Sequence, residues 1–519
     1  MKKIFTYIVL GSIITLSAVS CNDFLDTTQR GVTSQEDFYS TDDEAEQAVF
    51  AVYDALQAFD INNLLYKNLL SDDAQMGGGS RTAKQAGNEL NEFVFTDNND
   101  ILTDVFTNYY EIIYAANILL QKVSDDSDTK SLCRAEAKVL RAHAYFELTT
   151  LWGTPPLVTE PLEAGNYNQP NSTQEELWAQ IETDLTEAIE VLPLKSEQSS
   201  ADKARVSKGT AQSLLGKAYL YQEKYDEAAA MFDNVIESGE YDLYPDFTMI
   251  TREESEFGVE SIFEISYAAD ASNTSEGSYL LAYIGPRTGY FTPGTTGISS
   301  ICWGWMNPLP GLHELFEEEG DEIRQRGTVL NEDDLEEYGA SFRSSSGNLA
   351  YGSDGLVRTK YGAYVAEMAN QSETYYLCSG MNIRLLRYAD VLLMAAEAYN
   401  RKSSPNDTKA LEYVNLVRAR VELDPITETG DELFEKIKRE RRMELAFEMV
   451  RFQDLVRWGD AAEVLATQGQ YTSLGTYDSD GNMTYYENLN AGYKSYNNLL
   501  PFPETEISVN PNIVQNPGY

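Results

Sequence analysis

Histidine and cysteine are scarce in this chain of 519 residues, which contains 2 His and 4 Cys. So few imidazoles leave little material for histidine-based acid-base catalysis or for a zinc site. The chain also contains no Cys-x-x-Cys pair, no His-Glu-x-x-His, no Gly-x-Ser-x-Gly and no complete P-loop. We therefore expect no catalytic residue, no metal site and no cofactor.

Basic residues are also few: the chain contains 39 Lys and Arg and 83 Asp and Glu, which gives a formal net charge of -44. A chain of this charge repels a phosphate backbone, so nucleic acid is excluded as a partner. A neutral ligand remains compatible with this charge.

Long apolar runs are missing as well. The longest N-terminal stretch, residues 4–16, follows Lys2 and Lys3 and is too short to span a bilayer comfortably. This arrangement is typical of a secretory signal peptide, predicted here over residues 1–20. Small residues precede Cys21 and fit cleavage by an ordinary signal peptidase. A Cys directly after the cut also fits lipoprotein processing, and we predict that Cys21 becomes the acylated first residue of the mature protein. Three cysteines then remain, which leaves at least one free thiol.

Helical spacing dominates what the chain does contain. Thr41 with Glu44, and Thr173 with Glu176, form capping boxes that predict helix starts. Apolar residues recur at helical spacing over 42–59, 101–123, 132–152 and 173–192. Residues 70–100 are rich in Gly, Asn and Asp and are predicted to form a long loop.

Residues 212–237 resemble one tetratricopeptide repeat. Gly216 and Tyr219 are followed by Ala228 and Phe232 at the spacing of that repeat. A weaker echo occupies 392–421. Stacked helix pairs of this kind form a rigid scaffold with a broad surface.

The predicted fold is therefore mainly α, a tetratricopeptide-like helical-pair scaffold with a large irregular loop-rich insertion. The predicted order of segments is a signal peptide (1–20), a lipid-anchored tether (21–40), an N-terminal helical scaffold (41–250), a loop-rich insertion (251–380), a C-terminal helical scaffold (381–465) and an irregular C-terminal segment (466–519).

Four passages together resemble the SusD/RagB family of outer-membrane nutrient-binding lipoproteins. They span nearly the whole mature chain in the family's order. The passages are Cys21–Asp26 with Asp37–Tyr39 and Ala51–Tyr53, Arg134–Phe146 with Leu151–Gly153, Arg387–Tyr399 with Glu440–Glu448 and Arg451–Gly459, and Leu500–Glu504 with Gln515–Tyr519.

The resemblance implies a lipid-anchored protein on the outer membrane of Bacteroidetes-type bacteria. Members act as the lid of a SusC-like TonB-dependent transporter and are generally not enzymes. Most known ligands are oligosaccharides, and some members bind peptides. We expect an oligosaccharide ligand, with a peptide ligand or a purely adaptor role beside the transporter as alternatives.

A sugar-binding site needs flat aromatic faces and a few placed polar groups. The family takes such residues from the loop after the first helix and from the central insertion. The candidates here are Asp72, Asp73, Arg81 and Asn98 in the loop, and Tyr283, Tyr290, Trp303, Trp305 and Tyr351 in the insertion. Burial in the core is the competing interpretation of the two tryptophans.

Several further residues favour structural roles. The charged residues between 440 and 454 crowd what we predict to be one long helix, and we interpret them as ion pairs between helices. His143 is predicted to lie in the core and His313 on the surface. Asp354-Gly355 and the Asp478–Gly481 segment are predicted hairpin turns, although the latter also resembles part of a calcium loop. Cys133 is predicted to be buried, and pairing of Cys302 with Cys378 stays open.

Overall fold

The computed structural model describes residues 38–58, 61–270, 273–369 and 378–519. The predicted signal peptide and Cys21 lie outside the described residues. The scaffold consists of helices that run from both halves of the chain. They are α2 (Asp42–Gln57), α3 (Ile61–Leu69), α5 (Asp100–Lys122), α6 (Asp128–Trp152), α7 (Gln174–Ile189), α8 (Lys208–Tyr221), α9 (Tyr225–Glu237), α14 (Tyr388–Arg401), α15 (Asp407–Arg420), α16 (Gly430–Leu445), α17 (Arg451–Trp458) and α18 (Ala461–Val464).

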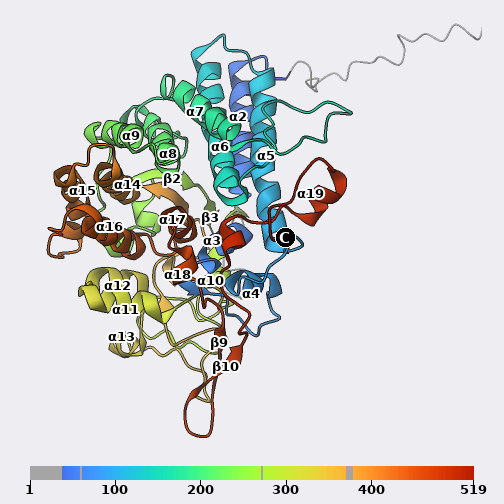
Figure 1. The fold of residues 1–519 in the computed structure, drawn as a ribbon. Coiled ribbons are helices and arrows are strands. Elements are labelled where there is room, and N and C mark those ends of the chain that lie inside the picture. The colour runs from blue at the N-terminus through green and yellow to red at the C-terminus, as the bar shows by residue number, and fades with distance from the viewer. Residues whose placement is uncertain (1–37, 59–60, 271–272, 370–377) are drawn as a thin grey trace, which may run out of the picture.

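Helices that follow one another in the chain pack as neighbours, so the scaffold is a curved stack of pairs (Figure 1). Helix α9 packs against α14, which joins the N-terminal helices to the C-terminal ones. The predicted mainly α, tetratricopeptide-like fold is confirmed. In the described part of the chain, no helix combines the length and the apolar character that crossing a membrane requires.

Local sequence explains where these helices begin and how closely they approach. Both predicted capping boxes are present, at the start of α2 and at the start of α7. Gly216 of α8 faces Phe232 of α9, and a Cβ at Gly216 would lie 2.6 Å from the Phe232 ring. The tetratricopeptide spacing therefore predicted a real contact between paired helices.

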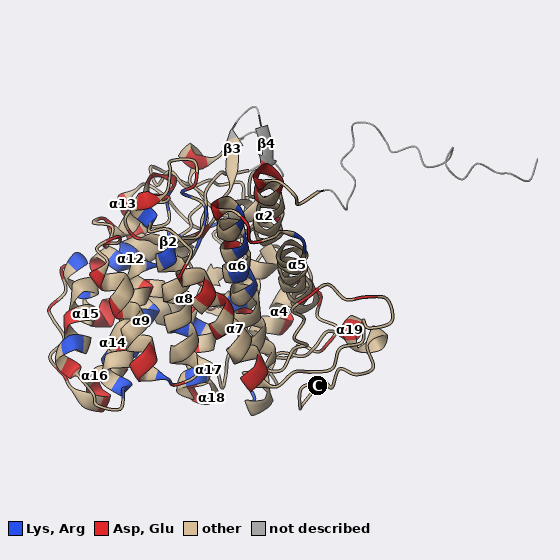
Figure 2. Cartoon of the chain, turned by 90° about the horizontal axis from the view of Figure 1, so that it is seen from above, with Lys and Arg blue, Asp and Glu red and all other residues tan. Residues whose placement is uncertain are grey.

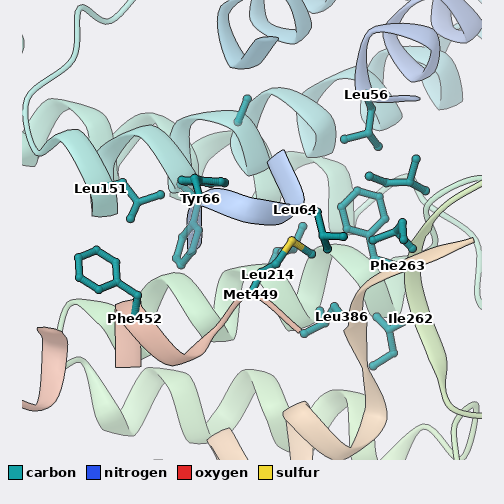
Figure 3. Packing of buried hydrophobic residues seen from close by; sticks show 14 of the residues in the cluster. Leu56, Leu64, Tyr66, Leu151, Leu214, Ile262, Phe263, Leu386, Met449 and Phe452 are labelled. Atoms are coloured by element: carbon teal, nitrogen blue, oxygen red, sulfur yellow. The ribbon is translucent and has the colours of Figure 1, made fainter. Parts of the chain in front are cut away.

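Part of the extended core lies where α3, α6 and α17 meet the strand segments that contain Phe263 and Leu386 (Figure 3). Tyr66 of α3 and Phe452 of α17 are both buried there, and burying an aromatic side chain of this size stabilises the fold by about 2–3 kcal/mol. His143 of α6 is buried too, and its ring lies edge-on to Phe263 with centroids 5.4 Å apart. The predicted core position of His143 is confirmed, as is the burial of Cys133.

The charged residues between 440 and 454 do not share one long helix, as we predicted. Helix α16 ends at Leu445 and α17 begins at Arg451, because Phe447 and Met449 adopt positive φ angles of 64° and 62° between them. The predicted ion pairs are nevertheless present, and acidic and basic segments alternate around α14, α15 and α16 (Figure 2).

Glu444 is at the centre of this network. Its carboxylate pairs with Arg324, Arg387 and Arg420, and all four side chains are buried. Burial alone would raise the pKa of Glu444, but the three guanidinium groups lower it far below its usual value. The family-like motifs around Arg387 and Glu444 are thus structural, because they lock the C-terminal helices to the insertion.

The insertion contains more regular structure than the irregular segment that we predicted. It includes the helices α10 (Leu280–Ile284), α11 (Pro310–Glu319), α12 (Glu322–Thr328) and α13 (Glu332–Glu337). Five two-stranded antiparallel sheets complete the described structure. They pair β1 (Ala74–Gln75) with β5 (Asn307–Pro308), β2 (Ser261–Ile265) with β8 (Ile383–Arg387), β3 (Ala268–Asp270) with β4 (Asn273–Glu276), β6 (Val329–Leu330) with β7 (Val357–Arg358), and β9 (Tyr471–Tyr477) with β10 (Met483–Glu487).

Three local predictions need correction. The loop 70–100 contains a further helix, α4 (Gln85–Asn91). Asp354-Gly355 does not turn a hairpin, because the strand that follows, β7, pairs with the distant β6. His313 is buried rather than on the surface, because α11 packs against α12 and the side chains of Gln325 and Asn331 approach its Nε2 at 3.2 Å.

The predicted turn at Asp478–Gly481 does join a hairpin, between β9 and β10. The Asp478 carboxylate accepts hydrogen bonds from the backbone N–H groups of Asp480 and Asn482, both at 2.9 Å. This aspartate therefore stabilises the turn itself. Among the described residues, no group of three or more His, Cys, Asp or Glu is arranged to hold a metal ion.

Candidate functional site

Three aromatic side chains of the insertion form one cluster. Tyr283 stacks on Trp305 with ring centroids 5.0 Å apart, and Trp303 lies 5.6 Å from Tyr283 and 5.8 Å from Trp305. Backbone hydrogen bonds from Trp303 N to Ala282 O and from Trp305 N to Tyr283 O, both 2.9 Å, tie the two segments together. The cluster is therefore held rigidly by its own main chain. We call Tyr283, Trp303 and Trp305 the aromatic cluster.

The members of the aromatic cluster differ in exposure. Trp305 is only 6% exposed, whereas Tyr283 and Trp303 are partly exposed. Trp305 thus forms the buried part of the cluster, and Tyr283 and Trp303 expose ring surface to solvent. Cys302, beside Trp303, and Cys378 are both buried, and these two cysteines form no disulfide with each other in this structure.

A glycine-rich segment from the N-terminal loop packs against Trp305. Pairing of β1 with β5 brings Gly78 to the edge of the indole, where a Cβ would lie 2.9 Å from Trp305 Nε1. Gly78 also has a φ of +103°, a conformation that residues with a side chain rarely adopt. A glycine at position 78 is therefore needed so that the main chain can approach the tryptophan.

Polar side chains also lie near Gly78. Its backbone forms a β-bridge with Tyr351, which places Tyr351 next to the glycine segment. Arg81 donates three hydrogen bonds to the Glu92 carboxylate, at 2.8, 2.9 and 3.1 Å, and its guanidinium lies 4.7 Å from the ring centroid of Tyr486. Burial raises the pKa of Tyr351 to about 12, so its hydroxyl stays protonated.

Arg287, Tyr486 and Glu92 were missed by sequence reasoning. Arg287 donates a hydrogen bond from Nη1 to the carbonyl of Trp303 at 3.2 Å and is partly exposed. Tyr486 reaches the site only because the β9–β10 hairpin brings in the C-terminal segment. The tyrosine-rich composition of that segment was a signal for aromatic surface, but the sequence carried no signal for where the hairpin would lie.

Four of the nine predicted residues lie apart from this arrangement. Asp72 pairs with Arg442 and Arg451, and Asp73 pairs with Arg442 at 2.8 Å. Burial alone would raise the pKa of Asp72, but the two arginines hold it below its usual value. Both aspartates thus contact the C-terminal helices.

The remaining two predicted residues have other surroundings. Tyr290 packs beside a small separate core that includes Phe291 and Phe342. Asn98 accepts a hydrogen bond from the Thr96 hydroxyl at 2.6 Å, just before α5. The structure brings Tyr283, Trp303, Trp305, Arg81 and Tyr351 together around Gly78, and leaves Asp72, Asp73, Tyr290 and Asn98 outside that group.

Comparison with known protein families matches both halves of the chain. Residues 23–220 match a family described as "starch-binding associating with outer membrane". Residues 259–519 match the SusD family. The chain belongs to the SusD family. The resemblance that the four sequence passages indicated is thereby confirmed.

Individual relatives support the same assignment. A SusD-like protein P2 of Formosa agariphila is 28% identical over 546 residues, covering 100% of both chains. The solved structure of a "laminarin binding SusD-like protein" is 31% identical, with a TM-score of 0.77 over 92% of this chain and 99% of that chain. Surface glycan-binding protein A from Bacteroides thetaiotaomicron, solved with laminarihexaose, is 26% identical, with a TM-score of 0.74 over 92% of this chain and 100% of that chain. None of these names describes an enzyme.

Proposed function

We propose that this SusD family member is a binding protein, without catalytic activity, that captures an oligosaccharide at the cell surface. The observation that carries the proposal is the aromatic cluster, whose partly exposed Tyr283 and Trp303 rings are held rigidly beside Arg287. Arg81 lies nearby, against the ring of Tyr486. Pyranose rings pack their C–H faces on such aromatic surfaces, and guanidinium groups donate hydrogen bonds to sugar hydroxyls.

Laminarin-type oligosaccharides are the first ligands to test. The relative of 31% identity is named for laminarin binding, and the Bacteroides thetaiotaomicron relative was solved with laminarihexaose. A rigid aromatic surface binds with little loss of side-chain freedom, which favours affinity. Of the nine predicted ligand residues, we retain Tyr283, Trp303, Trp305, Arg81 and Tyr351 as the proposed binding set.

The test is calorimetric titration of the protein lacking residues 1–21 with a panel of oligosaccharides and a panel of peptides. Replacing Trp303 by Ala removes a ring face, which should weaken glycan binding by about 2 kcal/mol, roughly 30-fold. Tyr114→Ala is the matched control, because this tyrosine of α5 is 62% exposed and is outside the proposed site. Binding of peptides and of no oligosaccharide would refute the proposal and favour the peptide alternative.

We further propose that the protein is anchored in the outer membrane through acylated Cys21 and passes its ligand to a SusC-like TonB-dependent transporter. The family description of association with the outer membrane supports the location. Rigid helix pairs offer a broad surface for docking on a transporter, while the insertion presents the aromatic cluster. Affinity purification of the full chain from detergent-solubilised membranes should recover the transporter, and recovery of the chain alone would contradict this partnership.

A further inference from the structure

One pocket of the described structure shares no lining residue with the aromatic cluster. It is enclosed by α5, by the loop 156–169 and by the C-terminal helix α19 (Glu504–Val509), which lies alongside α5 (Figure 1). Its volume is about 230 Å³. A space of this size holds several water molecules or one compact ring.

The walls of this pocket are mainly apolar and aromatic. The rings of Phe106 and Tyr110 line it with centroids 5.0 Å apart, and Pro156, Val158 and Ile513 add apolar surface. Tyr167 also lines the pocket and is 62% exposed, so it stands at the solvent side of the pocket. Such walls favour a compact apolar or ring-shaped body.

Hydrogen bonds between the two covering segments preform the pocket. The Asn510 side chain donates to the carbonyl of Gln169 at 2.7 Å, and the Asn512 side chain donates to the carbonyl of Asn168 at 2.7 Å. Asn171 exchanges two further hydrogen bonds with the backbone of Val514. These hydrogen bonds hold residues 168–171 of the loop against residues 510–514 of the C-terminal segment.

One charged side chain lines the pocket, the carboxylate of Glu506. No described residue donates a hydrogen bond to this carboxylate or pairs with it as a cation, and burial without compensation raises its pKa. Burial raises the pKa of Tyr110, and Tyr145 and the negative charge of Glu506 raise it further; Tyr110 and Glu506 line the same pocket. A half-buried acid without a partner costs stability, and a ligand that supplies positive charge would offset that cost.

Two further polar side chains of the pocket are already engaged in hydrogen bonds. The Tyr110 hydroxyl donates to the carbonyl of Pro156 at 2.7 Å, and the Gln169 amide donates to the carbonyl of Asn166 at 2.8 Å. A neutral sugar would need several free donors and acceptors around its ring. The Glu506 carboxylate and the aromatic rings around the pocket instead favour a cationic ligand, because ammonium groups are attracted both to carboxylates and to aromatic rings.

We propose that this pocket is a second ligand site that binds a primary ammonium group carried on a compact body, with Glu506 as its counter-ion. An amino sugar and the side chain of a lysine both present this chemistry. Tyr167 covers the bound group from the solvent side. The site operates independently of the aromatic cluster, so its test does not depend on the proposed oligosaccharide function.

The test is titration of the protein lacking residues 1–21 with glucosamine, with its neutral analogue N-acetylglucosamine, and with Nα-acetyl-lysine amide, followed by NMR or calorimetry. We expect saturable binding of at least one of the two amines, and at least tenfold weaker binding of N-acetylglucosamine. The tighter of the two amines identifies the source of the ammonium group. Equal binding of the neutral analogue, or binding of none of the three compounds, would overturn the proposal.

Matched variants locate the binding. Glu506→Gln should weaken amine binding at least tenfold, whereas Glu504→Gln removes the same charge from an exposed position of the same helix and should leave it unchanged. Because Glu506 has no partner to lose, its variant should unfold at a temperature no lower than the parent. Trp303→Ala should not change amine binding. Unchanged amine affinity in Glu506→Gln would refute the assignment.

Discussion

Replacing Gly78 by Ala tests whether close contact of the glycine segment builds the binding site. Gly78 has a φ of +103°, and an L residue held at positive φ costs roughly 1–2 kcal/mol. The added Cβ would also lie 2.9 Å from Trp305 Nε1 and 3.0 Å from Cδ1, and overpacking of this kind typically costs about 1–3 kcal/mol. The sum predicts a loss of about 2–5 kcal/mol in the free energy of unfolding.

Gly239→Ala is the matched control for this experiment. Gly239 has a φ of +70°, but a Cβ there would meet no atom within 4 Å, so only the backbone cost of about 1–2 kcal/mol applies. Urea denaturation of both variants separates the two contributions. Gly78→Ala should also weaken oligosaccharide binding, because Trp305 must shift beneath Tyr283, whereas Gly239→Ala should not. Equal stability losses and unchanged binding in the two variants would refute the reasoning.

Three further predictions follow from buried charges and from the N-terminus. Glu444→Gln removes a carboxylate shared by three buried arginines and should lower the free energy of unfolding by about 3 kcal/mol in urea titrations. The control is Glu412→Gln, which removes an exposed carboxylate paired with Lys409 and should lower that free energy by less than about 1 kcal/mol. Burial lowers the pKa of His143 to about 4, so the unfolded chain binds a proton at this imidazole more readily than the folded chain does. The free energy of unfolding should therefore fall as the pH drops from 6.5 towards 4. His143→Leu should lack that part of the pH dependence, and an unchanged pH profile in this variant would contradict the lowered pKa of His143. Cys21→Ala should move the protein from the membrane fraction to the soluble fraction, and retention of metabolic lipid label by this variant would exclude Cys21 as the anchor.

The helical scaffold was predictable because its signals are local. Capping boxes at Thr41 and Thr173, and the spacing of Gly216 to Phe232, each describe contacts within a few dozen residues. The break between α16 and α17 was not predictable, because no Gly or Pro marks it and two residues with side chains, Phe447 and Met449, take positive φ angles. Tertiary packing of buried aromatic and charged groups imposes that break.

The candidate site was predictable only in part, because it is assembled from distant segments. Trp303 and Trp305 are conspicuous as a pair, and their contact with Tyr283 follows from short-range backbone pairing. Tyr486 comes from a hairpin about 180 residues further along the chain, and no local pattern predicts its position beside Arg81. Glu506 was missed for the same reason, because its lack of a partner is a property of the fold.

The central claim is that the aromatic cluster binds a sugar, and a crystal structure of the protein soaked in laminarihexaose tests it most directly. Electron density for a pyranose ring stacked on Tyr283 or Trp303, with a hydroxyl within hydrogen-bonding distance of Arg81 or Arg287, is the predicted result. Ordered oligosaccharide bound elsewhere on the protein, with the Tyr283 and Trp303 faces uncovered, would contradict the account.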